Sequence, residues 1–266
     1  MQYFSFIGTG GQNGYDEISY YFDNNPSNQI KSQFIQEAII KNHADIDHIF
    51  IFATETAREK YGGILLERLK PYNKPLDFIA ISENDTFEVY TSKLLKTMRE
   101  SGKVIIDITH SFRSIPMKLL FALRYIELTK NGQIQHLYYG RKVGGTGEIV
   151  DLIQDYALQK ISELLSQFDR TLMINSTDVD KLFTQKDEII EGFISSLANF
   201  NKMIEQCEFD RTTTVIHQIM ESCSEIIRQP ESYSLIRPVV TSIKNKFAIY
   251  NNCNNNVSRK IELVKV

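Results

Sequence analysis

The sequence contains little cysteine and no long apolar run, and each absence argues against a class of protein. Its three cysteines, Cys207, Cys223 and Cys253, are odd in number and widely spaced. Disulfide-rich secreted domains use paired cysteines, and structural zinc sites need closely spaced Cys or His, so neither class fits. No segment approaches the ~18 apolar residues of a transmembrane helix, and the N-terminus does not resemble a signal peptide. We expect a cytoplasmic protein with reduced thiols, no metal, no cofactor and no membrane partner.

An excess of positive charge is also missing. The 30 Lys and Arg residues face 33 Asp and Glu, which gives a formal net charge of −3. General nucleic-acid binders are usually basic, so we expect no general DNA binding, although a local basic pocket stays compatible with this balance.

Short apolar runs alternate with helical patterns over roughly the first 150 residues. Several runs are nearly continuous in Ile, Phe and Val, which is typical of strands covered on both faces in a parallel sheet. Helical stripes lie between them, the first formed by Ile30, Phe34, Ala38 and Ile39. The alternation predicts a doubly wound α/β layer structure. The predicted strands are residues 3–8, 17–22, 47–54, 76–81, 103–108 and 134–140.

The pattern changes after about residue 149, where helical periodicity with polar breaks replaces the strands. We place a boundary near residues 150–175 and divide the chain into an α/β domain (1–155) and an all-helical region (156–266). The polar segment 251–266 is compatible with a terminus and with a linker to a further domain.

The segment "KVIIDITHSFRSIP" (103–116) places many hydrogen-bonding groups between a buried strand and a helix. Ser114 is suited to capping that helix and Pro116 to its first turn. The intervening residues lie where unpaired helix N–H groups favour an anion, phosphate especially. The structural alternative is that Asp107 and Thr109 tie the loop together while Arg113 pairs with Asp107.

Two other strands end in similar loops. Residues 8–13 ("GTGGQN") let the backbone approach a ligand closely, and Thr54, Glu55 and Thr56 follow the next parallel strand. The glycine pattern fits neither GxGxxG nor a P-loop, which disfavours a dinucleotide enzyme. For the glycine-rich residues 141–148 we favour a hairpin tip over a mobile cover.

The motifs "FIGTG", "QFIQEAI", "FATETA" and above all "DITHSFRSIP" resemble those of the CRISPR-associated Rossmann-fold (CARF) accessory proteins of type III CRISPR systems. The resemblance covers about the first 150 residues and implies a Rossmann-like, mainly parallel sheet with helices on both faces, followed by an all-α region. It also implies a homodimer that senses a cyclic oligoadenylate, cyclic tetra-adenylate being favoured, and that signals through its helical region to a fused or separate effector. Asp107 is expected to hold its loop rather than touch an anionic ligand. The residues expected to bind the ligand are Gly8, Thr9, Gly10, Gln12, Asn13, Thr54, Thr109, His110, Ser111 and Arg113.

Two enzymatic alternatives remain open at this stage. In a ring nuclease, His110 would move a proton and Arg113 or Lys142 would stabilise developing charge on the phosphate. In a HEPN-type ribonuclease, Arg211 and His217 of "RTTTVIH" would form the Arg-x4–6-His motif. The structural alternative is that Arg211 is an ordinary exposed arginine and His217 an ordinary histidine of a helix. A DNA-binding regulator is less favoured because no basic recognition helix is evident. The sequence does not give the ring size of the ligand, whether the ring is cleaved, or the chemistry of an effector.

Overall fold

The chain divides into two compact units, Met1–Ile153 and Gln154–Val266, which are described separately. The computed structural model describes residues 1–11, 14–23, 25–110, 114–130, 132–174, 187–229 and 233–251.

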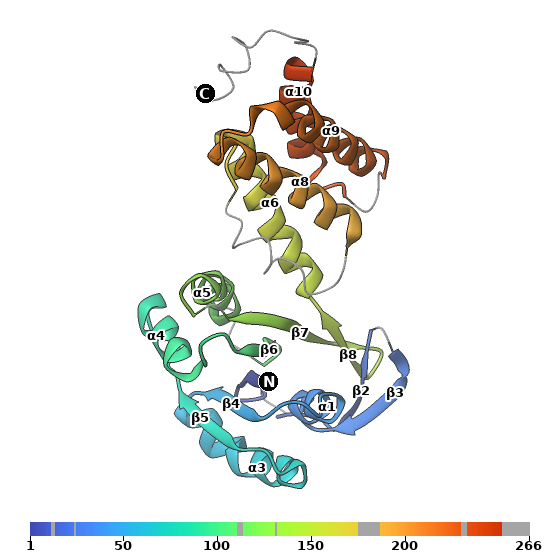
Figure 1. The fold of residues 1–266 in the computed structure, drawn as a ribbon. Helices are drawn as coiled ribbons and strands as arrows, with labels where there is room; N and C mark the ends of the chain where they lie inside the picture. The colour runs from blue at the N-terminus through green and yellow to red at the C-terminus, as the bar shows by residue number, and fades with distance from the viewer. Residues whose placement is uncertain are drawn as a thin grey trace. The chain divides into compact units, whose positions relative to one another are not determined.

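The first unit is built on one eight-stranded mixed sheet (Figure 1). Its strand order is β3-β2-β8-β7-β6-β1-β4-β5. The five strands β5-β4-β1-β6-β7 are parallel and form the doubly wound core, whereas β8 pairs antiparallel with β7. The strands are β1 (Gln2–Ile7), β2 (Ile18–Phe22), β3 (Asn25–Ser32), β4 (His48–Ala53), β5 (Leu76–Ala80), β6 (Lys103–Asp107), β7 (Gln133–Val143) and β8 (Thr146–Asp151).

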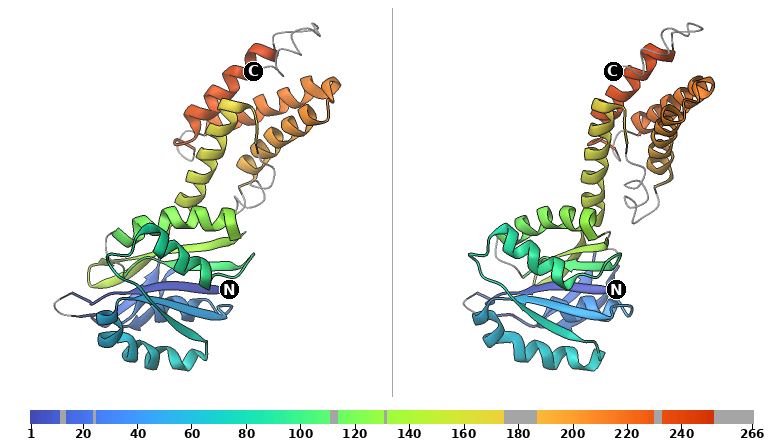
Figure 2. Two further views of the ribbon diagram at one scale, coloured as in Figure 1. Left: turned by 90° about the vertical axis from the view of Figure 1, so that its left-hand side faces the viewer. Right: turned by 60° about the vertical axis from the view of Figure 1, so that its left-hand side comes forward.

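Helices cover both faces of this sheet. Figure 2 shows the sheet nearly edge-on, with α5 on one face and α3 on the other. The mainly parallel sheet between helical layers confirms the predicted Rossmann-like α/β class. The helical segments are α1 (Ile35–Asn42), α2 (Glu55–Ala57), the π-helical turn η1 (Arg58–Gly62), α3 (Gly63–Leu69), the 3-10 turn η2 (Lys70–Tyr72), α4 (Phe87–Thr97) and α5 (Ser114–Lys130).

Strand β1 shows why the apolar runs are continuous rather than alternating. All six of its residues are buried, because successive side chains point to opposite faces and each face carries a helical layer. Tyr3 and Ile7 belong to the core formed with α1 and α3. On the other face, the Phe6 ring lies 6.3 Å from that of Tyr90 in α4.

The structure corrects the sequence prediction between residues 25 and 35 and after residue 145. Ile30, assigned to the first helical stripe, lies in β3, and helix α1 begins only at Ile35. Residues 141–148 form the predicted hairpin, in which Val143 pairs with Thr146, but β8 was not predicted as a strand. Helix α5 begins at Ser114, so Pro116 lies in its first turn and Ser114 is a helical residue rather than its cap.

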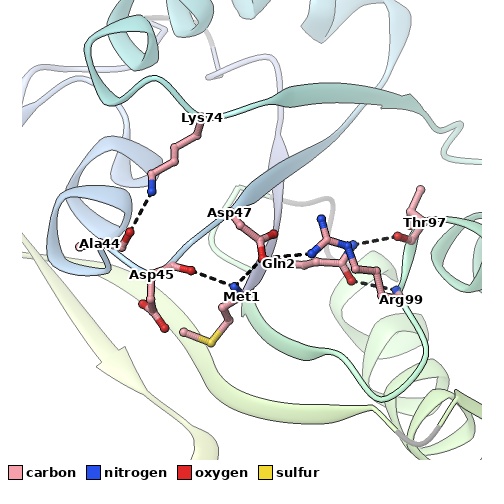
Figure 3. A network of polar contacts seen from close by, with 8 residues as sticks. All are labelled: Met1, Gln2, Ala44, Asp45, Asp47, Lys74, Thr97 and Arg99. Atoms are coloured by element: carbon pink, nitrogen blue, oxygen red, sulfur yellow. Dashed lines mark hydrogen bonds and ion pairs between the residues drawn. The ribbon is translucent and has the colours of Figure 1, made fainter.

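The edge of the sheet at which β1 begins is tied together by polar contacts (Figure 3). The Met1 ammonium donates to the carbonyl of Asp45 and to Asp47 Oδ2, at 2.8 and 3.0 Å. Arg99 Nη1 also donates to Asp47 Oδ2, at 3.0 Å. Burial of the Asp47 carboxyl opposes ionisation, but these two donors hold its pKa below the usual value. This network fixes the strand starts at the edge opposite to the one where β1 and β6 end.

The second unit is helical in its described part. It contains α6, which begins at Ile153 and ends at Thr171, α8 (Glu188–Glu205), the 3-10 turn η3 (Phe209–Arg211), α9 (Thr212–Arg228) and α10 (Arg237–Asn251). One apolar cluster joins its helices, with the rings of Phe168, Phe200 and Phe247 within 6.2 Å of one another. No helix in the described ranges is long and apolar enough to span a membrane. Of the polar segment 251–266, residues 252–266 lie outside the described residues.

Candidate functional site

The candidate site lies where the chain reverses direction across the sheet. After β1, and after the β2–β3 pair at the far edge of the sheet, the chain adds β4 on one side of β1 and later β6 on the other. The helices that follow these strands cover opposite faces, so a crevice opens beyond the carboxyl ends of β1 and β6. Because Ile7 pairs with Ala53, the next residues, Gly8 and Thr54, are neighbours at this edge.

Asp107, the last residue of β6, holds the strand end together. Its side chain is fully buried and accepts four hydrogen bonds. Oδ2 accepts from the hydroxyls of Ser5 at 2.6 Å and Tyr3 at 3.3 Å. Oδ1 accepts from the backbone N–H of Thr109 at 2.9 Å and from its hydroxyl at 2.5 Å. This carboxylate therefore has its partners inside the protein, as a structural role requires.

Thr109 joins the ends of β6 and β7. Its hydroxyl donates to Asp107 and accepts from the backbone N–H of Gly140 at 2.8 Å. A Cβ on Gly140 would lie 2.3 Å from Ile35 Cδ1 and 3.0 Å from Thr109, so this close approach requires glycine. Thr109 is predicted to contact the ligand, and its hydroxyl already makes two hydrogen bonds within the protein.

The loop after β1 is compact because its glycines take a left-handed backbone conformation. Gly10 and Gly14 have φ values of +70° and +76°, which side-chain-bearing residues rarely adopt. Both lie against the Tyr61 hydroxyl of η1, which a Cβ would approach to 2.9 and 2.5 Å. Lys60 Nζ donates to the carbonyl of Thr9 at 3.0 Å. The loop after β1 is thus packed on the helical segment that follows β4.

A cavity of about 260 Å³ opens beside this loop. His110 lines it, and its Nε2 is buried with no hydrogen-bond partner among the residues that the structure describes. Burial lowers the pKa of this imidazole below its usual value, against the opposing effect of the Asp107 carboxylate. An unpaired buried nitrogen is costly, so it marks a position where a ligand atom would be stabilised. The lining residues are Gly14, Tyr15, Asp16, Ile18, Tyr20, Thr109, His110, Gly140, Arg141, Lys142 and Gly147.

Two cations lie on the cavity wall, each paired with a carboxylate. Lys142 Nζ lies 3.1 Å from Asp16 Oδ2, and Arg141 Nε lies 2.5 Å from Glu148 Oε2. The Lys142 and Asp16 side chains are 59% and 64% exposed, so water weakens their attraction and an anionic ligand can replace Asp16. Within the described ranges no group of three or more His, Cys, Asp or Glu side chains is arranged to hold a metal ion.

The predicted ligand residues fall into four groups. Thr109 and His110 line the cavity, whereas Gly8, Thr9 and Gly10 lie at the same sheet edge without lining it. Thr54 caps α2, since its hydroxyl accepts the N–H of Ala57 at 3.3 Å. The remaining four, Gln12, Asn13, Ser111 and Arg113, lie outside the described residues.

Arg211 and His217 lie in the helical unit and do not share a cavity. Arg211 Nη1 pairs with Glu208 at 3.0 Å, and His217 Nδ1 lies 3.5 Å from Glu221. Arg211 lines a cavity with Lys202 and Gln218, whereas His217 lines a different one. Six helical residues correspond to roughly 600° of rotation, which places the two side chains on different faces. The roles of these two residues in a ribonuclease stay a prediction.

Sequence reasoning missed the aromatic side of the cavity. Tyr15 and Tyr20 line it from the segment after the glycine loop and from β2, and neither belongs to a chemical motif. Arg141 and Gly147 belong to residues 141–148, for which a hairpin tip was favoured over a mobile cover of the site. The signal in the sequence that could have indicated this side of the cavity is the position of Tyr15, directly after Gly14, the last glycine of the loop.

Together, the doubly wound sheet and the cavity at its reversal point define a Rossmann-like ligand-binding domain. Residues 2–142 match the family model described as "CRISPR system endoribonuclease Csx1, CARF domain", which covers more than half of the chain. The chain therefore belongs to the Csx1 CARF-domain family, and the resemblance seen in its motifs is confirmed. A similar protein is the CRISPR-associated protein MJ1674 of Methanocaldococcus jannaschii, with 27% identity over 121 residues. That match covers 44% of this chain but only 18% of the relative. Family and relative support a CRISPR-associated ligand-binding role.

Proposed function

We propose that this protein is the sensor of a cyclic oligoadenylate, cyclic tetra-adenylate being favoured, and that it signals from the α/β unit through its helical region to an effector. The ligand is held in the crevice beyond β1, β6 and β7. The sensing role rests on the family and on the chemistry of the crevice, which offers aromatic rings, a histidine and two cations.

The observation that carries the proposal is His110 of the cavity wall, whose buried Nε2 has no hydrogen-bond partner among the described residues. A base or ribose group bonded to this nitrogen supplies the missing partner, and Tyr15 and Tyr20 present apolar surface to a nucleobase. Lys142, released from Asp16, is within the same cavity for a phosphate.

Replacing His110 by alanine is expected to weaken binding of cyclic tetra-adenylate about tenfold or more, because a desolvated hydrogen bond is lost. Isothermal titration calorimetry of the whole chain measures this. The His217→Ala variant, changed at an exposed histidine of the helical unit, is the matched control and should bind as the unchanged protein does. Equal affinities of the His110→Ala and unchanged proteins would contradict the proposal. So would the finding that the unchanged protein binds none of cyclic tri-, tetra- and hexa-adenylate.

Size and exposed apolar surface support a homodimer. A cavity of about 260 Å³ is smaller than the roughly 300–1,000 Å³ of pockets for small ligands, so one chain accommodates only part of a ring. A ring of repeated nucleotides has symmetry that a two-fold dimer can match. Phe121 and Tyr125 are 66% and 50% exposed, one helical turn apart on α5, the helix that follows the site loop. Phe87 and Val89 are also exposed on the neighbouring α4. We assign this apolar face to a second copy of the chain.

Charged substitutions on this face should break the dimer. The double variant Phe121→Asp, Tyr125→Asp is expected to be monomeric in size-exclusion chromatography with light scattering, and to bind the ring at least tenfold more weakly. Ile64→Asp, on the opposite face of the sheet and similarly exposed, is the control and should remain dimeric. A double variant that stays dimeric would refute the assignment.

Cleavage of the bound ring is a second candidate function, favoured by the same unpaired nitrogen. A neutral imidazole with a lowered pKa can accept the proton of a 2′-hydroxyl that attacks the adjacent phosphodiester. Chromatography of the nucleotide recovered from the titration, with EDTA present, separates the two functions. An intact ring indicates a sensor alone, and a linear product that His110→Ala abolishes indicates a ring nuclease.

A further inference from the structure

We propose that Tyr15 is the positioning residue of the site, joining the three strand-end loops and setting the location of His110. This inference deepens the proposed function and rests on it for the ligand. It follows from the contacts of one side chain that belongs to no motif and to no helix or strand.

The hydroxyl of Tyr15 holds the end of β1. It accepts a hydrogen bond from the backbone N–H of Gly8 at 2.9 Å and donates one to the carbonyl of Gly8 at 3.1 Å. Burial raises the pKa of this phenol well above its usual value, so it stays protonated and remains a donor. One side chain thereby pairs with both backbone groups of the residue at which the first loop begins.

The ring of Tyr15 supports the loop after β6. Its centroid lies 4.5 Å from that of His110, with the planes at 63°, an edge-to-face arrangement. A Cβ on Gly8 would lie 3.3 Å from the His110 carbonyl, which shows how closely the two loops approach. The ring therefore forms one side of the space that His110 occupies and helps to keep its Nε2 away from water.

The same ring contacts the segment that follows β4. The ring centroid of Tyr61 in η1 lies 4.8 Å from that of Tyr15, edge-to-face with the planes at 64°. The ring centroid of Phe34 lies 5.5 Å from that of Tyr15. The backbone of Tyr15 is fixed as well, because Gln33 Nε2 donates to its carbonyl at 2.9 Å. Since Tyr61 also packs on Gly10 and Gly14, the loops after β1 and β6 and the helical segment after β4 meet around a single tyrosine.

Ring and hydroxyl have separable effects, which two substitutions distinguish. Tyr15→Phe keeps the ring and removes both hydrogen bonds to Gly8. Tyr15→Leu also removes the aromatic contact with His110 and lets water approach the imidazole. Because burial is the main cause of the lowered pKa of His110, that pKa should rise toward its ordinary value of about 6.5 in the leucine variant only.

The test uses two readouts on the free protein and one with ligand. NMR on the whole chain follows exchange of the Gly8 amide and the titration of His110, and calorimetry follows binding of cyclic tetra-adenylate. We expect Tyr15→Phe to speed Gly8 exchange, to leave the His110 titration unchanged and to weaken binding about tenfold. Tyr15→Leu should also raise the His110 pKa. The matched control is Tyr90→Phe, which removes a buried hydroxyl without a partner among the described residues and should leave all three readouts unchanged.

The outcomes separate this inference from the proposed function. Unchanged Gly8 exchange in Tyr15→Phe, or an unmoved His110 titration in Tyr15→Leu, would overturn the role of Tyr15. If both readouts on the free protein are as expected but the unchanged protein does not bind the ring, the proposed ligand is refuted. The positioning role of Tyr15 then stays supported.

Discussion

Replacing Asp107 by alanine is expected to lower the free energy of unfolding by about 3–5 kcal/mol and to abolish ligand binding. The fully buried carboxylate accepts four hydrogen bonds, from Tyr3, Ser5 and Thr109, and its removal leaves these donors without their acceptor. Thr109 then loses the contact that orients its hydroxyl toward Gly140, so the loop after β6 loses this tie to β7. We expect the loss of binding to exceed what the lost stability alone would cause, because the cavity wall itself changes.

Urea denaturation measures the stability change and calorimetry the affinity. The control is Asp77→Ala, at a carboxylate that is 61% exposed on β5 and paired with His48. Its unfolding free energy should change by less than about 0.5 kcal/mol, as is usual for surface positions. A similarly small change for Asp107→Ala would show that Asp107 does not hold the strand end.

The second large effect is expected at Gly10. Gly10→Ala should destabilise the fold by about 2–4 kcal/mol, since a left-handed alanine is strained and its Cβ meets backbone atoms that cannot move freely. That Cβ would lie 2.9 Å from the backbone of Gly14 and from the Tyr61 hydroxyl. The displaced loop would shift Gly14 and Tyr15, so the affinity for the ring should fall at least tenfold.

The neighbouring glycine separates backbone strain from steric conflict. Gly11 has a similar φ of +62°, but a Cβ placed there meets nothing within 4 Å. Gly11→Ala should therefore cost only the strain of about 1–2 kcal/mol and leave binding nearly unchanged. Equal effects of the two substitutions in thermal unfolding and calorimetry would argue that loop packing against Tyr61 is unimportant.

Hydrophobic pattern predicted the parallel core because those strands are buried on both faces. The strands outside this core were harder to recognise. In β3 six of eight residues are exposed, so the polar run 25–32 gives no strand signal and its one strongly apolar residue, Ile30, fitted a helical stripe by coincidence. Strand β8 begins with Thr146 and Gly147, and its pairing with β7 and β2 makes a strand of it. Pairing between distant segments does not appear in local sequence patterns.

The candidate site was predictable where it depends on strand ends and not where it depends on contacts between loops. Asp107, Thr109 and His110 are recognisable because Asp107 ends a buried strand and the other two follow it closely. Tyr15 gives no such signal, since its role depends on Gly8, Tyr61 and His110 meeting around it in three dimensions. The motif also assigned Thr109 to the ligand, and its hydroxyl bonds to Asp107 and Gly140 as well, which only the structure reveals.

Hydrogen–deuterium exchange of the whole chain, with and without cyclic tetra-adenylate, tests most directly whether this crevice holds the ligand. We predict that protection on binding concentrates in peptides covering residues 8–20, 107–114 and 139–147. Protection confined to the helical unit, or binding that leaves these three segments unprotected, would contradict the account.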